Sequence, residues 1–145
     1  MRLVIQRVEG ASVEVVETKE IVGKIGKGLF ILVGVGEDDT EKDAEVLAEK
    51  LSKMRIMSDS RGKMNMSIKD VQGEVLAVSQ FTLYADTSKG NRPSFIKAGE
   101  PKLAQRVYDH FVEKLRNLGV KVETGSFGDY MKIRAELDGP VTIII

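Results

Sequence analysis

The sequence predicts a mixed α+β fold, in which a strongly curved or barrel-like sheet carries two main helices. Short β-prone apolar runs fill residues 1–35, two amphipathic helical patterns follow at separate places, and more short apolar runs close the chain. The 145 residues contain no linker, low-complexity tract or internal repeat. A single domain spanning residues 1–145 is therefore expected.

The N-terminal part of the chain is expected to form four strands. The first two lie around Leu3–Val8 and Val13–Val16, and Glu9-Gly10 between them indicates a hairpin turn. Ile21–Ile25 is a third, short candidate. The continuously apolar run Leu29–Val33 is typical of a strand that is buried on both faces.

Two helices follow from capping signals and 3.6-residue periodicity. The first begins at Thr40, with Asp43 in the capping-box position. The second begins near Pro101, a favoured first-turn residue, and Gly119 is expected to end it. The apolar faces of the two helices consist of Ala44, Leu47, Ala48, Leu51 and Met54, and of Ala104, Val107, Tyr108, Phe111, Leu115 and Leu118.

Further strands are expected between and after the helices. The polar stretch 58–73 is predicted to be a long connection, and the loop 86–99 precedes the second helix. Asp138-Gly139-Pro140 has the composition of a turn that leads into the last strand. The expected strands are Glu74–Leu83, Val120–Val122, Tyr130–Ala135 and Val141–Ile145.

Composition argues against several kinds of site. The chain has no cysteine, which excludes disulfides, thiolate nucleophiles and cysteine-ligated zinc. The only histidine, His110, lies on the polar flank of the second helix and is expected to be solvated, so neither a histidine triad nor a catalytic zinc is expected. Asp38 and Asp39 are interpreted as complementing the dipole of the first helix. No metal and no cofactor is predicted.

The charge balance bears on partners. With 22 basic and 22 acidic residues the net charge is +0, which argues mildly against tight, nonspecific nucleic-acid binding, and DNA is not an expected partner. No apolar run approaches the ~20 residues of a membrane span, and the N-terminal apolar stretch is too short for a signal peptide. A cytoplasmic protein without a membrane partner is expected.

One polar segment follows a buried strand directly. Alternation along a strand would send Ser79 and Phe81 to one face, and Gln80 and Thr82 to the other. Buried polar groups need partners, so the segment is either a functional site or a strand end whose polar groups neighbouring loops satisfy. The residues alone leave these two interpretations open. For Asp138-Gly139-Pro140 they favour the plain turn.

Together these segments resemble the D-aminoacyl-tRNA deacylase family, also described as D-tyrosyl-tRNA(Tyr) deacylases. The paired signatures are Ser79-Gln80-Phe81-Thr82-Leu83 and Asp138-Gly139-Pro140-Val141-Thr142. Because further matching segments occur in order, the resemblance covers essentially the whole chain. These segments are Gln6-Arg7-Val8 with Ala11 and Val13, Gly90–Phe95, and Gly125–Met131.

The resemblance implies a homodimeric hydrolase that cleaves the ester between a D-amino acid, or mischarged glycine, and the 3′-terminal adenosine of tRNA. Ser79, Gln80, Phe81 and Thr82 would line the adenosine and ester region, with backbone N–H groups polarising the ester carbonyl. Gly139 and Pro140, joined by a cis peptide bond, would enter the pocket of the partner subunit and exclude L side chains. Substrate-binding roles also fall on Arg7, Phe127 and Met131.

The resemblance favours water attack assisted by the 2′-OH of the tRNA over a Thr82 nucleophile, because no obvious base lies near Thr82 in the sequence. Lys89, Arg92, Lys97 and Lys102 are either contacts for the tRNA body or a solvated basic surface. The alternative function is a non-catalytic RNA-binding protein that recognises the tRNA 3′ end. A structural or regulatory dimer is the third possibility.

Overall fold

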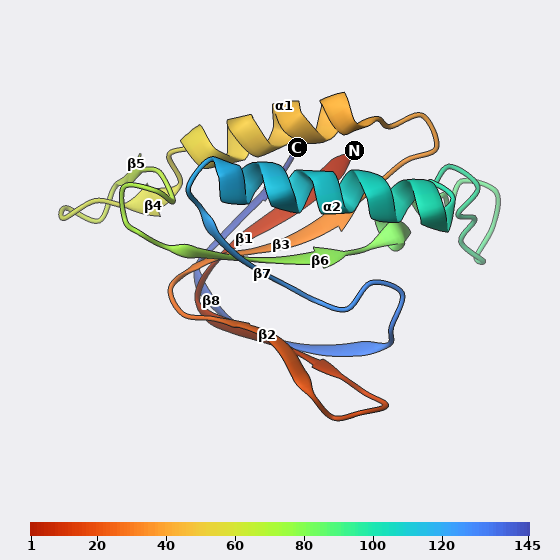
Figure 1. The fold of residues 1–145 in the computed structure, drawn as a ribbon, viewed down its shortest axis with the longest axis horizontal. Helices are drawn as coiled ribbons and strands as arrows, with labels where there is room; N and C mark the ends of the chain where they lie inside the picture. Colours follow the sequence, from red (N-terminus) through yellow and green to blue (C-terminus); the bar gives the residue numbers. More distant parts are fainter.

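The computed structural model describes residues 1–145 and shows two helices lying side by side over one face of a curved six-stranded sheet (Figure 1). The helices are α1 (Glu41–Lys53) and α2 (Pro101–Asn117), and a short 3-10 helix, η1, covers Phe81–Tyr84. The strands are β1 (Arg2–Val15), β2 (Ile21–Ile25), β3 (Gly28–Gly34), β4 (Met57–Ser58), β5 (Met64–Met66), β6 (Glu74–Ser79), β7 (Lys121–Thr124) and β8 (Met131–Ile144).

The sheet is mixed, with strand order β2-β1-β3-β6-β7 and with β8 paired to β1. Antiparallel pairing joins β1 to β3, from Arg2 opposite Gly34 to Val8 opposite Gly28. The β3–β6 and β6–β7 pairs are parallel. The other antiparallel partner, β8, accompanies β1 almost from end to end, and a separate two-stranded sheet joins β4 to β5.

The sheet curls until its two ends approach each other. Gly23 in β2 lies so close to β7 that a Cβ at this position would sit 2.4 Å from the carbonyl oxygen of Thr124. Only a residue without a side chain permits that approach. The expectation of a mixed α+β fold, with two helices and a barrel-like sheet, is confirmed.

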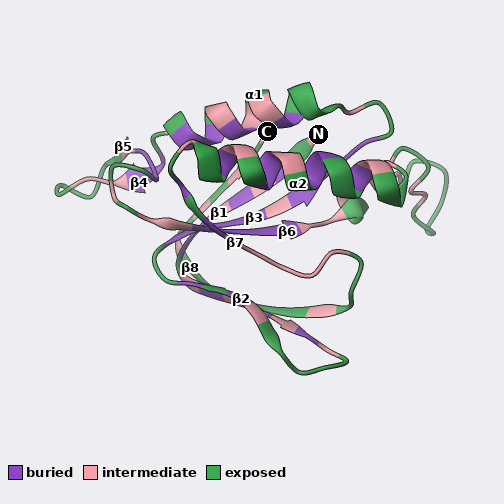
Figure 2. Cartoon of the chain, in the orientation of Figure 1, coloured by how far each residue is buried: buried purple, intermediate pink, exposed green.

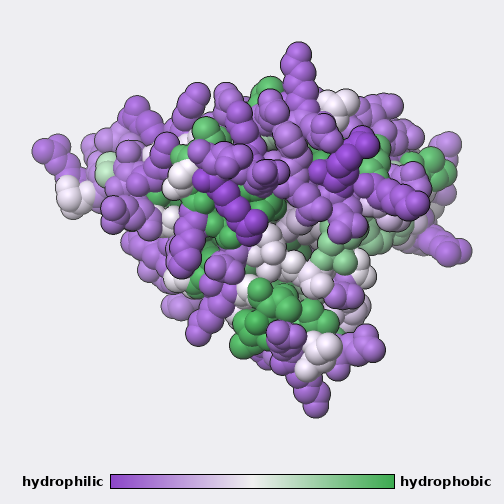
Figure 3. Space-filling view, in the orientation of Figure 1, coloured by the Kyte–Doolittle hydropathy of each residue, from purple (hydrophilic) through white to green (hydrophobic).

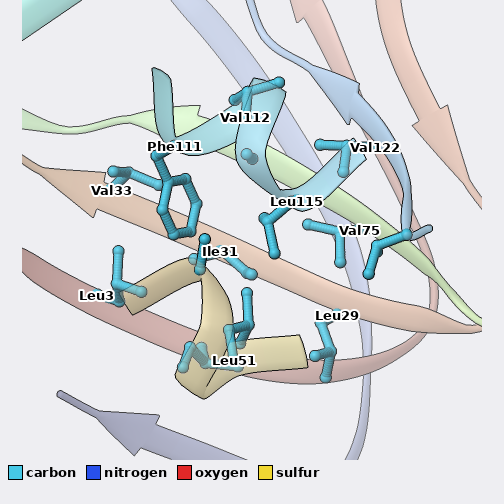
Figure 4. Close-up of a cluster of buried hydrophobic side chains, with 14 of the residues drawn as sticks. Leu3, Leu29, Ile31, Val33, Leu51, Val75, Phe111, Val112, Leu115 and Val122 are labelled. Carbon is cyan, nitrogen blue, oxygen red and sulfur yellow. The ribbon is translucent and has the colours of Figure 1, made fainter. Parts of the chain in front are cut away.

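The central strands are largely buried, as their purple colour in Figure 2 shows, and apolar side chains cover both of their faces. One cluster fills the space between helices and sheet, where Phe111 and Leu115 of α2 and Leu51 of α1 point toward β3 (Figure 4). A smaller cluster, including Phe30 and Val78, lies on the opposite face inside the curled sheet. Burial on two faces explains why β3 is almost entirely apolar, as expected for Leu29–Val33.

The helix ends follow the capping signals. The Asp43 carboxylate accepts hydrogen bonds from the Thr40 N–H at 2.8 Å and from the Thr40 hydroxyl at 2.6 Å. Pro101 is the first residue of α2, and Gly119 follows its end with φ of 85°. Neither helix is long and apolar enough to cross a membrane.

A row of polar contacts joins the exposed sides of the two helices. It includes His110, whose Nε2 lies 2.9 Å from Oε1 of Glu45 and whose side chain is 33% exposed. His110 thus lies partly exposed on the polar flank of α2, as expected, and α1 adds a carboxylate contact that the sequence did not indicate. The neighbouring pairs are Arg106 with Glu41 at 3.1 Å and Lys114 with Glu49 at 3.0 Å.

Several predicted element boundaries are wrong. No hairpin turn forms at Glu9-Gly10: β1 runs straight through, and Gly10 pairs with Glu136 of β8. The segments expected as two last strands belong to the single strand β8, which contains Asp138-Gly139-Pro140. At Gly10 the long partner strand keeps the chain extended where its local composition favours a turn, whereas residues 138–141 leave the register as a bulge within β8. The stretch 58–73, expected to be a plain connection, contributes to the β4–β5 hairpin.

Candidate functional site

A cavity of about 750 Å³ opens beside the end of β6, η1 and the beginning of α2. Ten of its 17 lining residues are hydrophobic, so its walls are mainly apolar with a few polar groups, as in many ligand pockets. Ser79, Gln80 and Phe81 form one side. The other sides are formed by Val35, Val78, Phe95, Ala98, Gly99, Glu100, Pro101, Ala104, Phe127, Gly128, Asp129, Tyr130, Met131 and Ile133.

The chain changes direction where β6 ends. The Gln80 N–H still donates to the Val33 carbonyl at 2.8 Å, but Leu83 N–H then bonds back to the Gln80 carbonyl at 3.3 Å and closes the 3-10 turn. The strand predicted to reach Leu83 therefore stops at Ser79, and the alternation expected for residues 79–84 is wrong. Thr82 is exposed, and its hydroxyl accepts a hydrogen bond from Nε2 of Gln80 at 2.6 Å.

Aromatic side chains stand at the cavity. The rings of Phe81 and Phe95 meet edge to face, with centroids 5.1 Å apart and an angle of 72°. Phe81 is 55% exposed, so a flat ligand can reach its ring. On the far wall Phe127 packs near Tyr108, whose hydroxyl donates to the Ala77 carbonyl at 2.9 Å. Burial raises the pKa of Tyr108 and keeps its hydroxyl protonated.

Residues outside the cavity hold η1 in place. The Tyr84 hydroxyl donates to Oδ2 of Asp39 at 3.0 Å, and the same oxygen accepts the Gly36 N–H at 2.5 Å. The Arg2 guanidinium lies 4.5 Å from the Tyr84 ring centroid and donates to the Leu83 carbonyl at 2.8 Å. Burial and the Asp39 carboxylate together raise the pKa of Tyr84 to about 12. Contacts from β1 and from the end of β3 thus fix the turn that follows the cavity.

The sequence does not indicate that Asp39 supports η1. It suggests a role for Asp39 at the dipole of α1, whereas the Asp39 carboxylate accepts hydrogen bonds from the Gly36 N–H and the Tyr84 hydroxyl. The one available signal was the position of Tyr84 directly after the Ser79–Leu83 signature. No periodicity connects a loop residue with a 3-10 helix residue 45 positions further along the chain.

Gly139 and Pro140 lie in a bulge of β8. Gln6 pairs with Thr142 and Val8 pairs with Leu137, so only Arg7 stands opposite residues 138–141. The Gly139-Pro140 peptide bond is cis, and Gly139 has φ of 123°, which L side chains rarely adopt. The bulge exposes both residues at the surface.

The buried side chain of Arg7 supports this bulge from the interior of the protein. Its side chain is 8% exposed, its Nε lies 2.7 Å from Oδ2 of Asp138, and its Nη1 donates to the Ile56 carbonyl at 3.1 Å. The Nε–H is not aligned for a hydrogen bond, so its contact with Asp138 is chiefly an ion pair. A buried guanidinium needs such a partner, because an unpaired charge in the interior is costly.

The structure thus divides the predicted site residues into two groups. Ser79, Gln80, Phe81, Phe127 and Met131 line one cavity. The other group lies outside the cavity of its own chain and consists of Thr82, Arg7, Gly139 and Pro140.

Comparison with known proteins gives one consistent result. The D-Tyr-tRNA(Tyr) deacylase family matches residues 4–145. A D-aminoacyl-tRNA deacylase of Thermotoga petrophila is 54% identical, covering 100% of this chain and 96% of the relative. Enzymes of the same description are 51% identical in Thermosipho melanesiensis, with coverages of 100% and 96%, and 53% identical in Bacillus cereus, with coverages of 100% and 98%.

Two solved structures share the fold. The c-Myc DNA Unwinding Element Binding Protein superposes with a TM-score of 0.91 at 39% identity, covering 100% of this chain and 97% of the other. A probable eukaryotic D-amino acid tRNA deacylase gives a TM-score of 0.88 at 17% identity, with coverages of 99% and 97%, and this likeness concerns the fold alone. On the family match and the full-length relatives, the chain belongs to the D-Tyr-tRNA(Tyr) deacylase family and is a D-aminoacyl-tRNA deacylase, an enzyme that hydrolyses the ester of a D-aminoacyl-tRNA.

Proposed function

We propose that this enzyme is a homodimeric proofreading hydrolase that removes D-amino acids and mischarged glycine from the 3′-terminal adenosine of tRNA and rejects L-aminoacyl-tRNA. The observation that carries the proposal is the cavity in which the Ser79-Gln80-Phe81 segment meets Phe127 and Met131. We place this activity in the cytoplasm, with tRNA as the partner in place of DNA or a membrane. The non-catalytic RNA-binding alternative is set aside because the full-length relatives are enzymes.

The cavity suits an aminoacyl-adenosine. Its volume of about 750 Å³ lies within the range of about 300–1,000 Å³ of small-molecule sites. The exposed ring of Phe81, braced by Phe95, offers a face on which adenine stacks. Such stacking contributes about 1–3 kcal/mol per base. Ser79 and Gln80 supply hydrogen-bonding groups beside it.

The chemistry proposed is hydrolysis assisted by the substrate. Water attacks the ester carbonyl carbon, the bond to the ribose 3′-oxygen breaks, and the neighbouring 2′-OH relays a proton from the water to that leaving oxygen. The N–H groups of Phe81 and Thr82 begin a 3-10 turn, where early N–H groups lack acceptors within the helix, and they would polarise the carbonyl. No metal ion or cofactor is assigned a role.

Thr82 is a poor nucleophile in this arrangement. A threonine hydroxyl needs an adjacent base to become reactive. The hydroxyl of Thr82 instead accepts a hydrogen bond from the Gln80 amide, which is not a base. This contact supports a role for Thr82 in holding the segment, with the reactive hydroxyl coming from the RNA.

The exposed strand β8 supports the homodimer. It pairs only with β1, and most of its residues are exposed, including the apolar side chains of Ile133, Leu137 and Ile144, at 36%, 49% and 72%. Exposed apolar surface of this kind is typical of an interface. Gly139 and Pro140 project from the same strand outside their own cavity, so a second copy seated on β8 would receive them in its cavity.

The proposed selectivity is rejection by shape. Backbone carbonyls of the Gly139-Pro140 segment would clash with an L side chain and leave room for a D side chain or for glycine. Exclusion discriminates more sharply than added hydrophobic contact, since a methylene group is worth only about 1–3 kcal/mol.

Hydrolysis assays with D-tyrosyl-tRNA, L-tyrosyl-tRNA and glycyl-tRNA test the proposal, each with and without EDTA. We expect the D-aminoacyl and glycyl esters to be cleaved with or without EDTA and the L-aminoacyl ester to persist. The Ala98→Trp variant, which places an indole in the cavity, serves as the control and should cleave none of them. Equal turnover of the two tyrosyl esters, or loss of activity in EDTA, would contradict the proposal.

A further inference from the structure

We propose that the loop between η1 and α2, together with the first turn of α2, binds the phosphates of the tRNA acceptor end as the RNA leaves the cavity. The inference rests on the proposed function and adds to it a contact surface for the RNA. The charged side chains that form this acceptor loop surface are Lys89, Arg92, Lys97 and Lys102, all exposed.

The inner part of the loop forms the rim of the cavity. Phe95 and Ala98 line the cavity, and Lys97 lies between them in the chain. The Glu37 N–H donates to the Lys97 carbonyl at 3.1 Å, and the Gly99 N–H donates to the Val35 carbonyl at 2.9 Å. These bonds fix the backbone of Lys97 at the rim. Lys102 follows Pro101, another lining residue, but it lines a separate hollow with Glu41 and Asp109, so Lys97 is the cation held next to the cavity wall.

The outer part of the loop carries two more cations, and backbone hydrogen bonds join the two ends of this part. Asp86 and Ser94 exchange backbone hydrogen bonds of 2.8 and 2.9 Å, and the Asp86 carboxylate accepts the Ser88 N–H at 2.9 Å. Between Asp86 and Ser94 the chain can extend about 10 Å from its base. Lys89 and Arg92 lie in this tip, where they can meet phosphates beyond the terminal adenosine.

The four cations of the acceptor loop surface form no ion pairs within the protein. None of the four takes part in the ion pairs of the structure, whereas on the neighbouring helix face Arg106 and Lys114 are paired with glutamates. Residues 86–102 hold these four cations and only two carboxylates, Asp86 and Glu100, in a chain whose net charge is +0. Within this segment the cations outnumber the carboxylates by two, which suits a short contact with RNA.

The position of the loop agrees with this role. In Figure 1 the loop projects beyond the ends of α1 and α2 where both helices begin, on the side of the molecule where η1 lies. Figure 3 shows mostly hydrophilic atoms at that end of the molecule. The β4–β5 hairpin, which also carries exposed cations, lies at the opposite end.

Paired charge reversals test the inference. The Lys89→Glu/Arg92→Glu double variant alters the loop tip, and the Arg61→Glu/Lys63→Glu double variant makes the same two changes on the remote hairpin. Each protein is assayed on D-tyrosyl-tRNA and on 3′-O-D-tyrosyl-adenosine, which carries the same ester without the RNA body. The readout is the ratio of the two kcat/KM values and its dependence on salt.

We expect the ratio of tRNA to adenosine ester to fall tenfold or more in the loop variant and to stay at the wild-type value in the hairpin variant. The slope of log KM for tRNA against log salt should also fall by about 1 for each lost phosphate contact. Equal ratios in the two variants, or a parallel loss on both esters, would overturn the inference.

The proposed function can fail separately from this inference. If the wild-type protein cleaves neither ester, the proposed hydrolysis is wrong, while binding of uncharged tRNA to the same two double variants still tests the loop. Weaker binding confined to the loop variant supports the acceptor loop surface. Equal binding by both variants rejects it.

Discussion

Arg7 and Asp138 form an ion pair between β1 and β8, with the Arg7 Nε 2.7 Å from the Asp138 Oδ2. The side chains are 8% and 28% exposed, so the pair is largely shielded from solvent. Because Arg7 also donates to the Ile56 carbonyl, it connects the β8 bulge to the segment that precedes β4. The placement of Gly139 and Pro140 therefore depends on a contact formed beneath them.

Removing the carboxylate charge should cost stability. Breaking a fully buried ion pair costs about 3–5 kcal/mol, and the partial exposure of Asp138 reduces the loss expected for Asp138→Asn to about 2 kcal/mol. Glu14→Gln is a matched control, because it removes the 3.1 Å pair with Arg134, whose side chain is 64% exposed, between the same two strands. That change should cost less than about 1 kcal/mol. Urea denaturation measures both, and equal losses would show that Arg7 does not depend on Asp138.

Gly139→Ala should change selectivity. At φ of 123° a Cβ would lie 2.8 Å from Cγ2 of Val141, so the segment must move to accept an alanine. We expect hydrolysis of L-tyrosyl-tRNA to rise relative to the D ester, or activity on both to be lost. Gly62→Ala is the control, because Gly62 also has positive φ, of 75°, with open space around it and a position in the remote hairpin. Unchanged D/L selectivity in Gly139→Ala would contradict the assigned role.

Thr82→Ala should retain substantial deacylation. If the 2′-OH of the tRNA assists the water, loss of the Thr82 hydroxyl removes only the 2.6 Å contact with Gln80, and kcat should fall by less than about tenfold. Single-turnover rates on D-tyrosyl-tRNA measure this. A D-tyrosyl-tRNA that carries 2′-deoxyadenosine at its 3′ end should lose far more activity. Complete inactivity of Thr82→Ala with intact tRNA binding would favour the threonine nucleophile.

Glu74 should make stability depend on acid pH. The hydrogen bond from the Lys121 ammonium, and after it the Gly26 N–H, holds the pKa of Glu74 below its usual value of 4.5. A carboxylate with a lowered pKa in the folded state stabilises the protein above pH 4.5 and loses that contribution as pH falls through the folded value. Glu74→Gln should therefore cost about 1 kcal/mol at pH 7 and progressively less below pH 4.5.

Denaturation curves at pH 7 and pH 3.5 test the Glu74 prediction. Glu9→Gln is a suitable control, because Glu9 and Lys27 are 3.6 Å apart and both about half exposed. Loss of this exposed ion pair should change the free energy of unfolding little at either pH. A cost for Glu74→Gln that is the same at both pH values would show that the ionised form is not the stabilising one.

The sequence predicted the elements that local signals define. The capping box of Thr40 and Asp43, the start of α2 at Pro101 and its end at Gly119 are all found, because each depends on neighbouring residues. The buried strand β3 was also predicted, because its unbroken apolar run is itself a local sign of burial on both faces. The order of strands and helices then led to a curved sheet with two helices.

Distant pairing explains what the sequence did not reveal. Gly10 and Gly139-Pro140 have the composition of turns, but Gly10 pairs with Glu136 within β1, and Gly139-Pro140 forms a bulge between two paired parts of β8. Asp39 supports η1 through its contact with Tyr84, and this contact depends on the loop that follows β3. Which residues share the cavity was predictable only in part: Ser79, Gln80 and Phe81 line it, whereas Thr82 turns away with the 3-10 helix.

Mixed dimers test most directly whether the selectivity segment of one chain serves the pocket of the other. One subunit carries Ala98→Trp, which fills its cavity, and the other carries Gly139→Ala. If the segments act across the dimer, one of the two sites combines an open cavity with an unaltered segment. The mixed dimer, separated from both homodimers, should then cleave D-tyrosyl-tRNA at about half the wild-type rate with full rejection of the L ester. If the mixed dimers show only the selectivity of Gly139→Ala alone, each segment serves its own cavity and the proposed assembly is contradicted.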